Sequence, residues 1–91
     1  MRYSYKPSFL KTLKKLTPTA KSSVKEAIKE LVIFFETGTR PGGLGLKKLR
    51  GQFWEIRAGL KIRIIFCLSD DIVEFIIVGT HDQIKQYLKQ V

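Results

Sequence analysis

The chain has 91 residues, 44% of them hydrophobic, which excludes a disordered protein and predicts a single domain over residues 1–91. It contains 17 lysines and arginines against 8 acidic residues, and the resulting formal net charge of +9 indicates a partner rich in negative charge. The first residues lack the apolar core of a signal peptide and no apolar run is long enough to cross a membrane, so we expect a cytoplasmic protein with no membrane partner.

The N-terminal segment predicts a short strand followed by a helix. Tyr3 and Tyr5 alternate with polar residues over residues 2–6, which is the period of a strand, and Pro7 ends the pattern. Apolar residues then recur over residues 8–16 with the spacing of an amphipathic helix, and lysines occupy the opposite side.

The next segment predicts a longer amphipathic helix that ends at about Phe35 or Glu36. Thr17 can cap its first turn, and Pro18 suits the first helical position because its missing N–H has no helical partner there. Gly38 follows as the C-terminal cap. Two consecutive helices of this kind predict a helical hairpin whose apolar side covers a sheet.

The segment after this helix is rich in glycine and in basic residues. Residues 37–45 contain four glycines but lack the spacing of a phosphate-binding loop, so we interpret them as a flexible connection, with contact to a partner as the lesser alternative. Lys47, Lys48 and Arg50 follow. They form either a solvated basic turn or a contact to a phosphate backbone, and the sequence leaves both interpretations open.

The most apolar part of the chain predicts an antiparallel meander. Its β-branched and aromatic runs cover residues 53–56, 62–68 and 72–78, and turn signals separate them at residues 57–60 and 69–71. The chain's one cysteine, Cys67, lies within the second run, which indicates a buried structural thiol and not a nucleophile. Since it has no partner for a disulfide within the chain, we expect a reducing compartment.

Two arginines flank the first turn of this meander. Arg57 ends one strand and Arg63 begins the next, so the two are expected to be cross-strand neighbours. Alternation places Arg63 on the same face as apolar residues, where a charge requires a partner. Arg63 is therefore either half of a structural ion pair with Glu55 or Glu74, or an anion-binding residue on a sheet face.

The C-terminal segment predicts a short helix over residues 82–89. His81 comes just before it, after the last strand, and by spacing alone it is a surface residue or a helix cap. Tyr87 is by the same reasoning a packing residue. Neither residue indicates a function without further information.

The chain resembles the RelE/ParE superfamily of bacterial and archaeal type II toxins, most clearly from residue 46 to residue 81. The resemblance implies an α+β fold, in which a small twisted antiparallel sheet, made of an N-terminal strand and a C-terminal meander, packs against an N-terminal helical hairpin and is followed by a short C-terminal helix. It extends over nearly the whole chain and is carried by four motifs in this order: Leu49-Arg50-Gly51, Ile56-Arg57, Ile62-Arg63-Ile64-Ile65-Phe66 and Ile76-Ile77-Val78-Gly79.

The resemblance also implies a function. Many members of this superfamily are endoribonucleases that cut mRNA on the ribosome without a metal or a cofactor, by attack of a ribose 2′-hydroxyl on the adjacent phosphate. Each is neutralised by a cognate antitoxin, and we expect operator DNA to be bound only through the complex with the antitoxin. The alternatives are inhibition of DNA gyrase, as in the ParE branch, and a degenerate toxin that binds only its antitoxin.

Carried over position by position, the resemblance implies a set of site residues. Arg57 and Arg63 match arginines that act on the scissile phosphate. His81, in Gly79-Thr80-His81, looks like the catalytic histidine of YafQ-type toxins, and Tyr87 stands at the spacing of a catalytic tyrosine in RelE. The residues expected to bind RNA, together with the lysines of the helices, are Lys47, Lys48, Arg50 and Lys61.

The chain also departs from the superfamily's pattern. RelE has two lysines on the aromatic strand, where this chain has Phe53 and Glu55. An aromatic residue that follows the histidine motif in YafQ-like toxins is replaced by Lys85. An acidic residue therefore stands where the resemblance predicts a cationic one.

Overall fold

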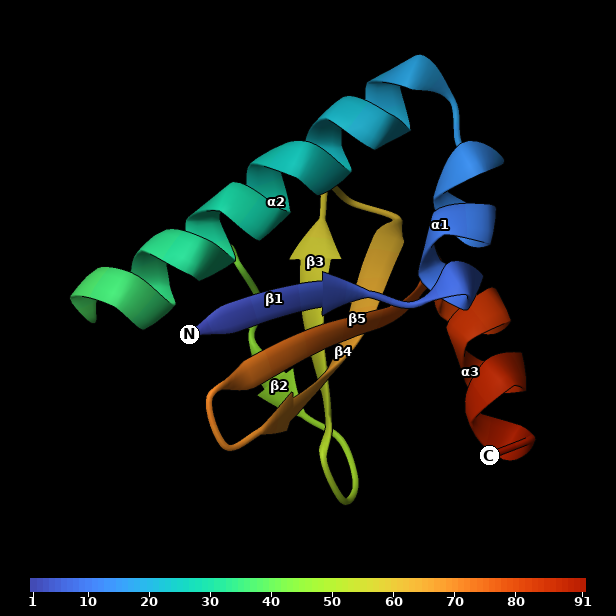
Figure 1. The fold of residues 1–91 in the computed structure, drawn as a ribbon. Helices are drawn as coiled ribbons and strands as arrows, with labels where there is room; N and C mark the ends of the chain where they lie inside the picture. The colour runs from blue at the N-terminus through green and yellow to red at the C-terminus, as the bar shows by residue number, and fades with distance from the viewer.

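The helices of this protein lie on both faces of one mixed sheet, in a computed structural model that describes all 91 residues (Figure 1). The predicted α+β fold is confirmed, with the N-terminal helices packed on the sheet and a short helix at the C-terminus. No helix is both long and apolar enough to span a membrane. In chain order the elements are β1 Arg2–Tyr5, α1 Pro7–Lys14, α2 Pro18–Thr37, β2 Lys47–Lys48, β3 Phe53–Ala58, β4 Ile62–Ser69, β5 Ile72–Thr80 and α3 His81–Lys89.

The ends of α2 are fixed by the caps that the sequence predicts. The hydroxyl oxygen of Thr17 accepts a hydrogen bond from the Ala20 N–H at 3.2 Å, which satisfies one of the unpaired donors of the first turn. Gly38 has a φ of 78°, and its N–H donates to the carbonyl oxygen of Phe34 at 2.8 Å. This left-handed conformation suits glycine and ends the helix.

Helix α3 begins one residue earlier than predicted, at His81, because Thr80 is its cap. The Thr80 hydroxyl oxygen accepts from the Gln83 N–H at 3.3 Å, and the Gln83 side chain accepts from the Thr80 N–H at 2.8 Å. This reciprocal pair is a capping box, and it joins the end of β5 directly to the helix. His81 is therefore the first helical residue and not the cap.

The sheet has the strand order β1-β5-β4-β3-β2. The meander of β3, β4 and β5 is antiparallel as predicted, but β1 pairs with β5 in parallel, so the sheet is mixed and not wholly antiparallel. The direction of α1 explains this pairing. The Ser8 hydroxyl donates to the carbonyl oxygen of Ile76 and the Thr12 hydroxyl accepts from the Val78 N–H, so α1 follows β5 in the same direction. Since β1 leads straight into α1, it too runs alongside β5.

Two turns close the meander. The first falls at residues 59–61 and not at 57–60 as predicted, because Arg57 and Ala58 still pair with Arg63 and Ile62. The second is the Asp70–Asp71 pair, in which Asp70 has a φ of 52°. Aspartate tolerates this left-handed conformation better than most residues, which matches the turn signal at residues 69–71.

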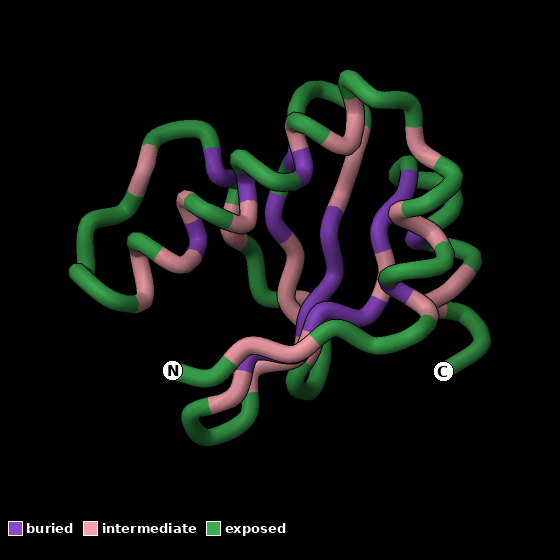
Figure 2. Tube along the Cα trace, turned by 45° about the horizontal axis from the view of Figure 1, so that its top comes forward, coloured by how far each residue is buried: buried purple, intermediate pink, exposed green.

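The two faces of the sheet carry separate apolar clusters. Helices α1 and α2 cover the larger one, in which Phe75 lies 5.7 Å from Phe9 and 6.0 Å from Phe66 between ring centroids. A smaller cluster of Ile65, Ile76 and Ile84 joins the other face to α3. Figure 2 shows the buried residues concentrated along the central strands and on the helix turns that face them.

The loop between α2 and β2 is anchored, although the sequence predicts a flexible connection. Leu44 is 1% exposed within the larger cluster, and its carbonyl oxygen accepts from the Arg57 N–H at 2.8 Å. Because β2 pairs with only two residues of β3, this part of the β3 edge is otherwise unpaired. The loop thus covers an edge that would be open to pairing with another chain.

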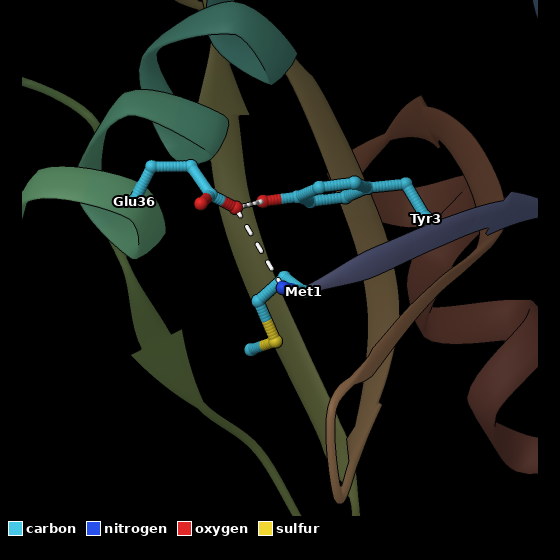
Figure 3. A network of polar contacts seen from close by, with 3 residues as sticks. All are labelled: Met1, Tyr3 and Glu36. Atoms are coloured by element: carbon cyan, nitrogen blue, oxygen red, sulfur yellow. Dashed lines mark hydrogen bonds and ion pairs between the residues drawn. The ribbon is translucent and has the colours of Figure 1, made fainter.

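Polar contacts connect the N-terminal segment and β1 to the last turn of α2. The Tyr3 hydroxyl donates to Oε1 of Glu36 at 3.1 Å, and the amino nitrogen of Met1 lies 3.8 Å from the same oxygen (Figure 3). Burial, and then the hydrogen bond and negative charge of Glu36, raise the pKa of Tyr3 from 10.0 to about 12. The phenol of Tyr3 therefore keeps its proton to a higher pH in the folded protein than in the unfolded chain.

This contact predicts a pH dependence of stability. The folded protein keeps the Tyr3 proton above the pKa of 10.0 that the unfolded chain has, so the free energy of unfolding should fall as the pH rises from 10.0 to about 12. Urea unfolding at several alkaline pH values measures this slope, and Tyr3→Phe should flatten it. An unchanged slope in Tyr3→Phe would show that other groups cause the alkaline loss.

The side chain of Arg50 forms hydrogen bonds with the C-terminal end of α3. Its Nη2 atom donates to the carbonyl oxygen of Leu88 and, at 3.0 Å, to that of Val91. The last carbonyl groups of a helix have no helical partners and carry partial negative charge, so a guanidinium stabilises them. The guanidinium of Arg50, which the sequence predicts to bind RNA, already has these structural partners.

Arg50→Ala should loosen α3 specifically. We expect a loss of about 1 kcal/mol in the free energy of unfolding and faster amide hydrogen exchange in the last turn of the helix. Arg40→Ala is the matched control, because Arg40 also donates to a carbonyl oxygen, that of Leu46, but outside α3. Equal exchange rates in α3 for wild type and Arg50→Ala would contradict the fastening role.

Candidate functional site

Three central strands bring the predicted site residues to one end of the sheet. Arg57 in β3 pairs with Arg63 in β4, and Arg63 pairs with Gly79 in β5. Directly opposite residues in antiparallel strands project to the same face, with Cβ atoms about 5 Å apart. His81 follows Gly79 by two residues, and Lys61 lies in the turn at the same end. The structure thus places these cationic residues and the histidine around one row of the sheet.

Arg63 is a largely buried cation with an incomplete set of partners. Its side chain is 17% exposed, and its Nε atom lies 3.8 Å from Oε2 of Glu55, whose side chain is 14% exposed. This distance is too long for a hydrogen bond. The Nη1 atom is buried and has no hydrogen-bond partner. Of the two ion-pair partners open from the sequence, the structure selects Glu55, and it leaves an arginine donor free.

Arg57 is exposed and lies along the edge of β3. Its side chain crosses the backbone of Gly45, where an added Cβ atom would be 2.8 Å from Arg57 Cγ. A side chain at position 45 would therefore displace the arginine. Arg57 also lines a shallow cavity of about 280 Å³ together with Glu26 and Glu30 of α2. Its backbone is adjacent to Arg63, while its side chain extends toward the loop and α2.

His81 and Tyr87 occupy different parts of α3. His81 is exposed at the first helical position, where its imidazole is open to solvent. Tyr87 is partly buried and packs against the smaller apolar cluster, as the spacing of the sequence predicts. The two residues are six positions apart, which is about 9 Å along a helix axis. The structure therefore brings His81 to the arginines' end of the sheet but gives Tyr87 a packing role.

The predicted RNA-binding residues do not form one group. Lys47 pairs with Glu55 and so lies on the face of Arg63, while Lys48 pairs with Trp54 and has its Nζ atom 5.9 Å from the centre of that ring. Adjacent residues of a strand point to opposite faces, which separates the two lysines. Lys47 thus shares the face of Arg63, and the exposed Lys61 lies in the turn just before that arginine. Lys48 lies on the face that α2 covers, and Arg50 donates hydrogen bonds to carbonyl groups at the C-terminal end of α3.

Cys67 is partly buried on the same face of the sheet as Arg63. Burial, followed by the negative charge of Glu74, raises the pKa of its thiol, which disfavours the nucleophilic thiolate. This agrees with the structural role inferred from the sequence. No three histidine, cysteine or acidic side chains lie close enough together to hold a metal ion.

One residue of the site, Gly45, was missed by the sequence reasoning, and the surroundings of another, Glu55, were only partly predicted. Gly45 supports the side chain of Arg57, and the only signal for it was a loop with four glycines. Glu55 was expected as one of two partners for Arg63, but nothing in the sequence showed that it lies among cations on the functional face. Alternation along β3 does place Glu55 and Arg57 on one face, so this signal was present but incomplete.

Comparison with known proteins identifies relatives by structure alone. No protein-family model matches the sequence, and the search of curated proteins finds no significant match. The structure is similar to the RelB–RelE antitoxin–toxin complex from Methanococcus jannaschii, with a TM-score of 0.70, 24% identity, and 91% of this chain and 95% of that chain covered.

Two further structures show the same similarity. The DinJ–YafQ complex of E. coli matches with a TM-score of 0.73 at 19% identity, covering 91% of this chain and 97% of that chain. The RelBE2 toxin–antitoxin complex of Mycobacterium tuberculosis matches with a TM-score of 0.65 at 18% identity, covering 88% and 96%. The chain therefore has the fold found in the RelE and YafQ toxins, as its sequence predicts.

Proposed function

We propose that this protein is the toxin of a type II toxin–antitoxin system and that it cleaves mRNA on the ribosome without a metal ion, until a cognate antitoxin neutralises it. The row formed by Arg57, Arg63 and Gly79, with His81 beside it, is the observation that carries this proposal. The fold supports the toxin role, since structures with this fold were solved as complexes of a toxin with its antitoxin.

Arg63 is the residue best placed to bind the scissile phosphate. The reaction begins when a ribose 2′-hydroxyl loses its proton and attacks the adjacent phosphorus, and negative charge then accumulates on the phosphoryl oxygens. A guanidinium held largely out of water, with an unused N–H at Nη1, can stabilise this charge in the transition state. Arg57 is the second cation: its backbone lies opposite Arg63, and its exposed side chain would have to turn from the loop and α2 toward the substrate.

His81 is the candidate for proton transfer. Histidine is the side chain that most readily exchanges protons near neutral pH, and His81 is exposed at the end of β5 where the substrate would approach the arginines. It can accept the proton of the 2′-hydroxyl or donate one to the leaving 5′-oxygen. The structure gives Tyr87 no comparable exposure, so its catalytic role rests on the resemblance alone.

The net charge of +9 supports binding to ribosomal RNA. Lys47 adds charge on the face of Arg63, Lys61 adds charge in the adjacent turn, and the exposed lysines of α1 and α2 add charge on the other side of the sheet. Lys48 and Arg50 contribute charge as well, although each already contacts a group of this protein. We expect binding to RNA to weaken steeply as the salt concentration rises.

The contact between Glu55 and Arg63 favours a second candidate function. A carboxylate beside the principal arginine weakens the case for catalysis, and a toxin that acts by binding alone does not need this site. Inhibition of DNA gyrase, as in ParE, is such a function. A protein that binds only its antitoxin, and operator DNA through that complex, is the remaining alternative.

Replacement of His81 separates these candidates. In a bacterium that expresses the wild type, we expect growth arrest and new mRNA 5′ ends, and in His81→Ala the cleavage rate should fall by about 10²–10⁴-fold because the proton-transfer group is gone. Gln86→Ala, an exposed change on the same helix, is the control.

The other outcomes for this experiment are also informative. Arrest without new mRNA ends, retained in His81→Ala and accompanied by DNA damage signalling, would replace the nuclease with gyrase inhibition. No arrest by the wild type would leave the antitoxin-binding role. Cleavage that persists unchanged in His81→Ala would remove this residue from the mechanism.

Replacement of Arg63 tests the phosphate-binding role. Arg63→Ala should lower cleavage by about 10²–10³-fold, since it removes the donors that stabilise the transition state. Circular dichroism and thermal unfolding establish whether the variant is folded, because the change also leaves Glu55 without its cation. A folded and fully active Arg63→Ala protein would refute the assignment.

A further inference from the structure

Glu55 is the carboxylate that lies beside Arg63 on this face of the sheet. Residues 1–63 contain 15 lysines and arginines and four acidic residues, and three of those acids, Glu26, Glu30 and Glu36, belong to α2. Glu55 alone lies on the strands, with Lys47 opposite it and Arg63 beside it. At 14% exposure its carboxylate is also poorly accessible to water and salt, which would otherwise screen it.

The geometry of the pair is that of an electrostatic contact without hydrogen bonds. A carboxylate and a guanidinium can form two parallel hydrogen bonds, which gives the strongest pairing. Here the approach is 3.8 Å from Nε to Oε2, and Nη1 has no partner. Glu55 therefore neutralises the charge of Arg63 but leaves its donors unused. A buried donor without a partner is unfavourable, so the contact with Glu55 leaves the guanidinium incompletely satisfied.

We propose that Glu55 is a built-in counter-anion that competes with phosphate for Arg63. A phosphodiester oxygen that binds the partly exposed guanidinium of Arg63 places a second negative charge beside the carboxylate of Glu55, and the two anions repel each other across a poorly solvated site. Binding then requires that Glu55 move away or that its repulsion be overcome. The charge of Glu55 thus holds the phosphate affinity of the site low. This inference rests on the proposed role of Arg63 as the phosphate-binding residue.

A purely structural role for Glu55 makes the opposite prediction. If Glu55 only positions the guanidinium, its removal disorders Arg63 and weakens phosphate binding. If it is a counter-anion, its removal strengthens binding. The sign of the change in affinity distinguishes the two roles, because both start from the same contact.

The test measures phosphate binding at Arg63 directly. Inorganic phosphate and a DNA trinucleotide, which has phosphodiesters but no 2′-hydroxyl to react, are titrated while the Nε–H resonance of Arg63 is followed by NMR. The Arg63→Lys variant identifies this resonance by its absence. In Glu55→Gln, which keeps the shape of the side chain and loses its charge, we expect the dissociation constant of both probes to fall about tenfold.

Glu74→Gln is the matched control. Glu74 is partly buried on β5 and pairs with Cys67, which stands four residues, or about 13 Å, along β4 from Arg63. Its loss removes the same charge from the same sheet and should leave the affinity at Arg63 nearly unchanged. Glu55→Thr repeats the test with a side chain suited to a strand, so the result does not depend on the glutamine amide or on the folding of one variant.

Each outcome decides the inference. Unchanged or weaker phosphate binding in Glu55→Gln and Glu55→Thr would overturn it, and an equal gain in Glu74→Gln would reduce it to a general effect of net charge. Cleavage of mRNA on ribosomes is measured in parallel. If the Glu55 variants bind phosphate more tightly but no protein cleaves mRNA, Glu55 is a counter-anion and the nuclease proposal is refuted. If mRNA is cleaved but phosphate affinity does not change, the nuclease proposal stands and the counter-anion inference is refuted.

Discussion

Strand β4 pairs with β3 on one side and with β5 on the other, and the twofold period along these strands divides the protein into two faces. Ile64 and Phe66 point into the core beneath α1 and α2, and the alternating residues Arg63 and Ile65 point the other way. A slip of one residue in this pairing would bury the arginine in the core and expose Phe66. The burial of the core therefore fixes the position of the arginine.

The two faces differ in how completely they are covered. Helices α1 and α2 enclose a core of 12 buried residues, whereas α3 is nine residues long and covers a cluster of three. The remainder of the second face holds Arg63, Glu55 and Lys47, of which Lys47 is open to solvent while the side chains of Arg63 and Glu55 are only 17% and 14% exposed. An incompletely paired arginine can persist there because the folded protein depends on the opposite face for most of its stability. Most of the apolar core thus lies on the face that two helices cover, and the site lies on the face that α3 alone covers.

Much of this arrangement could be predicted from the sequence, because the signals are local and periodic. The alternation that placed Arg63 and Cys67 on one face, and the capping of α2 by Thr17, depend on residues close together in the chain. The parallel pairing of β1 could not be predicted, because it depends on the path of α1 across β5. Contacts between distant residues, such as Arg50 with the end of α3, carry no periodic signal.

The residues of the site divide in the same way, into those that local signals predict and those that depend on distant contacts. Its cations could be named from motifs, but the choice of Glu55 over Glu74 as the partner of Arg63 required the register of β3 against β4. The support of Arg57 by Gly45 required the path of a loop that has no regular structure. Sequence reasoning thus identified the residue types of the site and the structure supplied their environment.

The irregularity in β5 has an effect on the whole C-terminal segment. Ile65 pairs with Ile77 while Phe66 pairs with Phe75, so Ile76 is an extra residue that shifts the alternation by one position. Beyond it Val78 faces α1, and Gly79 lies opposite Arg63. In a β5 shortened by this one residue, the chain would leave the strand on the side of α1 and α2. The number of residues in β5 therefore sets the side of the sheet on which His81 and α3 lie.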